Sequence, residues 1–180
     1  MRFHALSVQG AFMLEPEPRG DERGLFARIW CVEEFAAHGL SAGFEQASVS
    51  FNDVKHTLRG MHYQQEPHGE VKLVRCTAGA IFDVVVDMRE GSPSYLQWSG
   101  ETLTAQNRRA LYIPKGCAHG FITLEDASEV FYEIAGSYQP DAARGVRYSD
   151  PRIGISWPAK PARIAQRDAD YPLLSPLPRA

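Results

Sequence analysis

Hydrophobic and polar residues alternate along most of the chain, in short runs rich in β-branched and aromatic residues. The clearest runs are residues 43–51, 71–79, 80–89, 109–114 and 129–138. Clusters of glycine, proline, serine and aspartate separate these runs and mark turns. Many short strands with frequent turns predict an all-β protein, either a sandwich or a jelly roll.

Two segments depart from this alternation. Residues 31–40 have apolar positions at helical spacing, with Glu33 and Glu34 in the first turn and Gly39 at the end, and they predict one short helix. The segment after about residue 157 is rich in proline, so we expect an irregular strap across the surface. A chain of 180 residues fits a single domain, 1–180, that includes this strap.

Alternation also assigns side chains to faces of the strands, and it places two charged residues on the same faces as apolar residues. Asp83 shares a face with Val85, and Lys72 shares a face with Val74. A charged group in such surroundings needs a partner or a chemical task, because burying it alone is costly.

The stretch TLRGMHYQ, residues 57–64, combines a cation, a glycine and a titratable ring within one predicted strand. Strict alternation directs Leu58 and His62 to one face and Arg59 to the other. Arg59 and His62 can therefore meet one ligand only if Gly60 introduces a bulge or bend.

Composition and charge exclude several classes of protein. The formal net charge is −3, so no overall basic field predicts binding to nucleic acid or to an anionic membrane. No run of 18 apolar residues and no signal-peptide pattern occur, so we expect a cytoplasmic protein. Three widely spaced cysteines, Cys31, Cys76 and Cys117, are expected to be small core residues and not a disulfide framework or a zinc site.

A metal site is one reading of the histidines. Residues 113–121, IPKGCAHGF, match the second cupin motif, P-x-G-x-x-H, with His119 as its histidine. The first cupin element is H-x-H, but this chain has HYQ at 62–64. Lys72 stands about where the glutamate ligand of that motif would be, and an ammonium group cannot bind a metal ion. We therefore expect no bound metal.

Acid–base chemistry is the other reading. His62 can accept a proton from carbon near neutral pH, Tyr132 on another strand can donate one, and Lys72 can stabilise an enolate. The alternative is structural, with a hydrogen-bonded core histidine, a packed aromatic residue and a lysine at the rim. Spacing alone does not decide between these alternatives.

Six stretches, in this order, resemble one known family: DERGLFAR (21–28), LRGMHYQ (58–64), VKLVRCTAGAIFDVVVDMREGSPSY (71–95), LYIPKGCAHGF (111–121), EVFYEIAGSY (129–138) and GVRYSDPRIGISWP (145–158). Along nearly its whole length the chain is similar to the dTDP-4-dehydrorhamnose 3,5-epimerase (RmlC) family of the cupin superfamily. The resemblance implies a double-stranded β-helix, the cupin jelly roll, with a few short helices. It also implies a homodimer that needs no metal or organic cofactor and that inverts C3 and C5 of a nucleotide-linked 4-keto-6-deoxy sugar.

The resemblance assigns roles to individual residues. His62 resembles the catalytic base, Asp168 the carboxylate that orients it, Tyr132 the acid on the opposite face and Lys72 the cation near the developing oxyanion. Eight further positions resemble substrate contacts: Arg23, Phe26, Gln46, Ser48, Arg59, His119, Tyr138 and Arg167. Tyr138 resembles the aromatic residue that stacks on the nucleobase, whereas Arg167 has an ordinary surface role as its alternative, and Asp83 is expected to be a structural carboxylate.

Three positions depart from the family pattern. Arg28 and Ala143 stand where the family has glutamate, and Ser48 stands where it has asparagine. Arg28 either changes what the pocket admits or is compensated by a neighbouring carboxylate. The alternatives to a 3,5-epimerase are a C3-only or C5-only epimerase, a ketoisomerase on another nucleotide sugar, a non-catalytic sugar-binding cupin and a metal-dependent cupin oxygenase.

Overall fold

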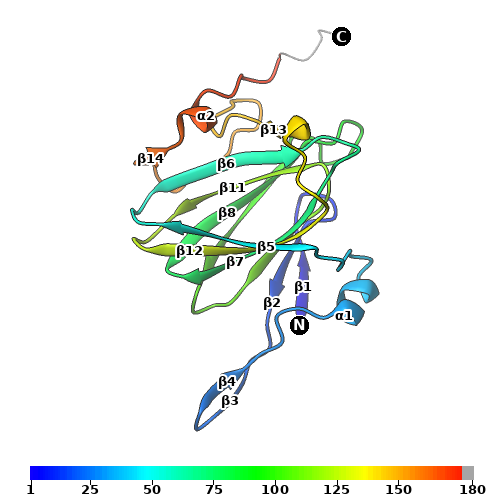
Figure 1. The fold of residues 1–180 in the computed structure, drawn as a ribbon, viewed down its shortest axis with the longest axis vertical. Coiled ribbons are helices and arrows are strands. Elements are labelled where there is room, and N and C mark those ends of the chain that lie inside the picture. Colours follow the sequence, from blue (N-terminus) through cyan, green and yellow to red (C-terminus); the bar gives the residue numbers. More distant parts are fainter. Residues whose placement is uncertain (176–180) are drawn as a thin grey trace.

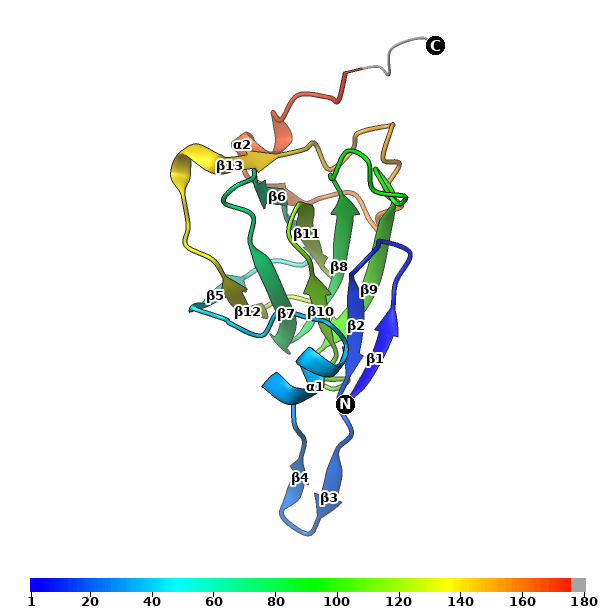
Figure 2. The same cartoon turned by 90° about the vertical axis from the view of Figure 1, so that its right-hand side faces the viewer.

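The computed structural model describes residues 1–175, and two β-sheets pack face to face in it (Figures 1 and 2). The first sheet has the order β1 (Arg2–Ala5), β2 (Phe12–Glu15), β10 (Ala110–Ile113), β7 (Val71–Ala78), β12 (Ser128–Ala135), β5 (Gln46–Asn52). The second has the order β13 (Ala143–Gly145), β6 (Thr57–Gln64), β11 (Cys117–Thr123), β8 (Ala80–Asp87), β9 (Trp98–Thr104), with β14 (Arg163–Ile164) also paired to β6. This architecture confirms the predicted all-β jelly roll.

The few helical segments are short. The predicted helix is α1 (Val32–Ala37), with Glu33 and Glu34 in its first turn. One turn of 3₁₀ helix, Pro140–Ala142, precedes β13, and α2 (Gln166–Ala169) lies near the C-terminus. No helix within residues 1–175 has the length and apolarity needed to cross a membrane.

The central strands are buried on both faces. Ile81 and Val85 on β8 pack between the sheets, whereas Val84 and Val86 pack in a second cluster on the other side of β8. Residues 146–157 cover that second cluster, and for this reason β8 has a nearly continuous apolar sequence. The segment after Trp157 then crosses the same side of the molecule and contributes β14 and α2 (Figure 1, orange to red).

The cysteines follow the sequence expectation in part. Cys76 and Cys117 are buried, and Cys31 is half-buried, so the expectation of a core position is wrong for Cys31. All three are free thiols. Burial raises the pKa of Cys76 to about 11 and that of Cys117 to about 12, so both stay protonated at neutral pH.

A hairpin formed by β3 (Arg19–Asp21) and β4 (Gly24–Phe26) projects away from both sheets (Figure 1, bottom). Its apolar side chains have little cover, since Phe26 is 77% exposed and Leu25 is 48% exposed. We call this segment, residues 19–26, the arm.

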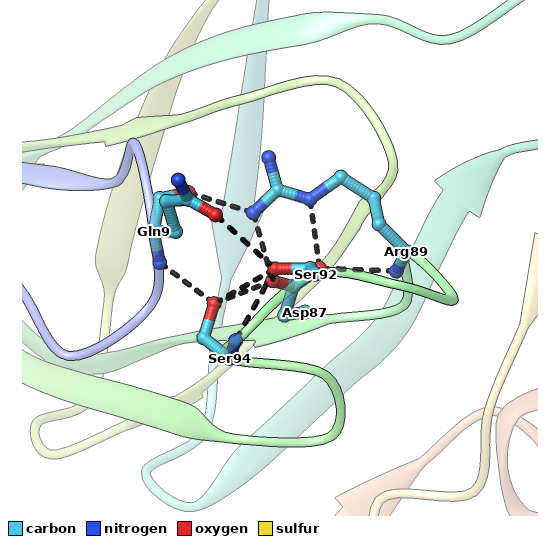
Figure 3. Close-up of polar contacts among 5 residues, drawn as sticks. All are labelled: Gln9, Asp87, Arg89, Ser92 and Ser94. Atoms are coloured by element: carbon cyan, nitrogen blue, oxygen red, sulfur yellow. Dashed lines mark hydrogen bonds and ion pairs between the residues drawn. The ribbon is translucent and has the colours of Figure 1, made fainter.

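A buried carboxylate joins the two sheets at one end of the molecule (Figure 3). Asp87 ends β8 and accepts hydrogen bonds from Arg89 Nε at 2.7 Å and from Ser94 Oγ at 2.6 Å, and also from Ser92. Arg89 and Ser94 also bond the backbone of Gln9, in the turn between β1 and β2. Burial alone would raise the pKa of Asp87, but the bonds from Arg89, Ser92 and Ser94 outweigh it and lower the pKa to about 2.

We expect Asp87 to make stability depend on acid pH. Its folded-state pKa lies below the ordinary value, so the ionised group contributes about 2 kcal/mol above pH 4, and this is lost as the pH falls towards 2. Urea unfolding of the Asp87→Asn variant is expected to show a lower midpoint at pH 7 and a weaker pH dependence below pH 4. The exposed Asp141→Asn change is the control. Parallel pH curves for the wild type and Asp87→Asn would contradict this assignment.

Candidate active site

A pocket of about 1150 Å³ opens between the sheets. Strands β5, β7 and β12 of the first sheet and β6 and β11 of the second supply its walls, and residues 162–168 of the strap close one side. Its lining combines aromatic and aliphatic side chains with several titratable groups, as is typical of small-molecule sites.

A bulge in β6 brings Arg59 and His62 to this pocket together. The register between β6 and β11 shifts so that two residues of β6, starting at Gly60, face Gly120 alone. The extra residue reverses the alternation, and both side chains line the pocket. Gly60 has a φ of +125°, and a Cβ there would lie 2.6 Å from the Cα of Gly120. The bend that the sequence required at Gly60 is confirmed.

Gly60→Ala is expected to destabilise the fold by about 3 kcal/mol, because strained backbone and backbone overlap add together. Gly91→Ala is the matched control, since Gly91 has a φ of +89° but no other atom within 4 Å of a Cβ. That variant is expected to lose about 1 kcal/mol, from backbone strain alone. Equal losses in urea unfolding would contradict the close approach at Gly60.

The imidazole of His62 bonds a carboxylate from the far end of the chain. His62 Nε2 lies 2.7 Å from Asp168 Oδ1, and the backbone N–H of Gly60 donates to Asp168 Oδ2 at 3.0 Å. Burial would raise the pKa of Asp168, but its bonds with His62 and Gly60 and the charges of His62 and Arg167 hold that pKa below its usual value. An ionised carboxylate only accepts hydrogen bonds, so Nε2 carries the proton and Nδ1 of the neutral ring is free to act as a base.

Tyr132 on β12 lines the same pocket from the opposite sheet. Burial, together with the negative charge of Asp83, raises the pKa of Tyr132, and the cation of Arg59 only partly opposes this. The phenol is therefore neutral and able to donate a proton at physiological pH. Asp83 itself is fully buried and bonds His119 Nε2 at 2.7 Å, which confirms its expected structural hydrogen bond.

Lys72 has a partner that the sequence analysis missed. Its Nζ lies 2.9 Å from Glu70 Oε1 and 3.5 Å from the backbone oxygen of His62. Glu70 lines the pocket beside it and also accepts a hydrogen bond from Gln64 at 3.1 Å. The signal was present, because residues two apart at the start of a strand share a face.

Six of the eight predicted substrate contacts lie in this pocket: Gln46, Ser48, Arg59, His119, Tyr138 and Arg167. The other two, Arg23 and Phe26, lie on the arm and not in the pocket of the same chain. Arg23 instead pairs with Asp21 at 2.5 Å.

The three departures from the family pattern fall in different places. Ser48 and Ala143 line the pocket. Arg28 lies outside it and pairs with Glu34 at 2.9 Å, so the structure supports compensation by a neighbouring carboxylate. Within residues 1–175, no group of three or more histidine, cysteine, aspartate and glutamate side chains is placed to hold a metal ion.

The fold and the pocket define a class: a cupin-type jelly roll whose pocket holds an oriented histidine, a neutral phenol and a paired lysine. Comparison with known proteins narrows this class. The family model described as dTDP-4-dehydrorhamnose 3,5-epimerase matches residues 5–176. The chain belongs to this family.

Individual relatives agree with the family match. A dTDP-4-dehydrorhamnose 3,5-epimerase of Sinorhizobium fredii is 37% identical over 99% of this chain and 92% of its own. A dTDP-4-dehydrorhamnose 3-epimerase of Streptomyces niveus is 39% identical over 97% of this chain and 84% of its own. The crystal structure of the Bacillus anthracis 3,5-epimerase with TDP and PPi bound has a TM-score of 0.91 and 36% identity, covering 96% of this chain and 99% of that one.

Proposed function

We propose that the chain is a cofactor-independent isomerase that inverts C3 and C5 of a dTDP-linked 4-keto-6-deoxy sugar. The observation that carries this proposal is the placement of His62, bonded to Asp168, in one pocket with Tyr132 from the opposite sheet. A base and an acid on opposite sides of a substrate are what inversion of a carbon centre requires. Family membership and the names of the relatives support the same activity.

The reaction uses the two residues in turn. His62 Nδ1 removes the proton from the carbon next to the C4 ketone, and the C–H electrons form an enolate. The ammonium group of Lys72 stabilises the enolate oxygen, and its fixed charge is effective because Lys72 is buried. Tyr132 then protonates the carbon from the other face as the carbonyl re-forms, and solvent restores both side chains to their starting states.

The remaining pocket residues suit a nucleotide diphosphate. Arg59, Arg167 and His119 provide positive charge or hydrogen-bond donors for the phosphates and sugar, and Tyr138 is an exposed aromatic ring on which a base can stack. Such a charged substrate does not cross a membrane unaided, so we also propose a cytoplasmic location. Inversion at C3 alone is the second candidate, and the Streptomyces niveus relative named a 3-epimerase favours it.

Solvent-deuterium exchange tests the activity. Purified protein in heavy water is expected to place deuterium at both C3 and C5 of dTDP-4-keto-6-deoxyglucose, read by proton NMR. His62→Ala is expected to slow exchange roughly 10²- to 10⁴-fold, because the base is lost. His68→Ala, at an exposed histidine, is the control.

The outcomes separate the candidates. Deuterium at C3 alone would replace the 3,5-epimerase with a 3-epimerase. No exchange into any 4-keto nucleotide sugar would remove the proposal. Unchanged exchange in His62→Ala would show that another group is the base.

We also propose a homodimer in which the arm completes the partner's pocket. The arm carries two predicted substrate contacts, Arg23 and Phe26, away from their own pocket. Its apolar side chains are exposed, as are Val49 and Phe51 on the edge strand β5. A second copy of the chain accounts for both observations, since it would cover apolar surface and receive the arm.

Mixed dimers test this arrangement. His62→Ala and Arg23→Ala proteins are each expected to be weakly active on their own. Arg23→Ala is expected to lower the exchange rate about 10-fold, because a charge-assisted contact with the substrate is lost. After co-expression, one pocket of the mixed dimer has both residues intact, so exchange activity is expected to return. A monomer in sedimentation, or mixed chains no more active than the separate variants, would contradict the proposal.

A further inference from the structure

One aromatic side chain, Tyr171, lies beside the imidazole of His62 without lining the pocket. It follows Asp168 by three residues in the strap. The ring centroids of Tyr171 and His62 are 6.1 Å apart with planes at 71°, an edge-to-face arrangement. The same short segment therefore supplies the carboxylate that bonds the imidazole and a ring that packs against it.

A glycine makes room for this ring. Gly145 on β13 lies directly opposite His62 on β6. A Cβ on Gly145 would overlap several ring atoms of Tyr171. The position that a side chain of β13 would occupy beside His62 is therefore filled by the ring from the strap.

Two arginines hold Tyr171 in place. Arg147 Nε donates a hydrogen bond to the backbone oxygen of Tyr171 at 2.6 Å, and Arg167 Nε donates to its hydroxyl at 3.0 Å. The guanidinium carbon of Arg167 also lies 5.9 Å from the ring centroid, within range of a cation–π contact. The ring is thus fixed independently of His62.

The imidazole of His62 needs a second contact to fix its orientation. Among the described residues, the bond to Asp168 is the one side-chain hydrogen bond of His62, and its side chain is 40% exposed. One bond at Nε2 sets the direction of that nitrogen but leaves the ring free to tilt about the bond. We propose that Tyr171 is a positioning residue that restricts this tilt and keeps Nδ1 aimed at the substrate proton. The inference rests on the proposed role of His62 as the base.

Kinetics of four variants test the inference. Tyr171→Ala and Gly145→Ala are each expected to lower kcat about 10-fold, because a misaligned base transfers protons slowly. KM is expected to change less than kcat, since Tyr171 does not line the pocket and reaches the substrate only through its bond with Arg167. Tyr171→Phe keeps the ring and is expected to retain most of the activity. The double variant, with both Gly145→Ala and Tyr171→Ala, is expected to have the same kcat as Tyr171→Ala, because the methyl group added at residue 145 then has no ring to displace.

A purely structural role would give other results. The inference would be overturned if the two reductions in kcat added together in the double variant. A Tyr171→Ala variant with a raised KM and an unchanged kcat would also overturn it. So would a Tyr171→Phe variant as slow as Tyr171→Ala. Thermal unfolding of each variant checks folding, and Tyr171→Leu replaces Tyr171→Ala if the latter does not fold.

A measurement on the free protein separates this inference from the proposed function. In Tyr171→Ala, NMR relaxation of the His62 ring is expected to show greater mobility, whereas that of the exposed His68 ring stays unchanged. Unaltered mobility of the His62 ring would overturn the inference even if the enzyme is an epimerase. Greater ring mobility in Tyr171→Ala without any deuterium exchange in the wild-type protein would show that Tyr171 restricts the imidazole and that the proposed activity, and with it the aiming of a base, fails.

Discussion

The contact between His62 Nε2 and Asp168 Oδ1 is the interaction on which the site depends. It joins residues 106 positions apart, so the strap must dock on β6 before the His62 imidazole is oriented. The backbone N–H of Gly60 bonds the second oxygen of the carboxylate, and β14 pairs in parallel with the start of β6. Docking of the strap and orientation of the imidazole are therefore one structural event, and burial of the carboxylate is offset by hydrogen bonds at both oxygens.

A second histidine–aspartate pair, His119 and Asp83, lies at the pocket wall, where His119 lines the pocket and Asp83 is fully buried behind it. His119 bonds Asp83 at the same 2.7 Å distance, but its side chain is 5% exposed whereas that of His62 is 40% exposed. The two histidines therefore differ in exposure and not in the hydrogen bond, because both line the pocket but the imidazole of His62 is far more accessible than that of His119. The negative charge of Asp83 also helps to keep the Tyr132 phenol protonated.

Much of the fold followed from the sequence, because period-two alternation and turn residues report directly on strands. Alternation failed at Gly60, where one inserted residue moved Arg59 to the face of His62. Alternation also could not predict the contact between Asp168 and His62, since local patterns do not report contacts between residues far apart in the sequence. Only the family resemblance indicated this contact. Glu70 was missed although its spacing from Lys72 indicated a shared face, whereas Tyr171 was missed because its significance lies in its spatial neighbours. Arg23 and Phe26 remain predictions that one chain alone cannot satisfy.

The central claim is that Asp168 holds the neutral His62 ring with its proton on Nε2 and leaves Nδ1 as the basic nitrogen. Nitrogen-15 NMR of the neutral imidazole distinguishes the two tautomers directly. The account predicts a protonated Nε2 and an unprotonated Nδ1 in the wild-type protein, with that preference weakened in Asp168→Ala. A proton on Nδ1, or a ring that exchanges freely between both tautomers in the wild-type protein, would contradict it.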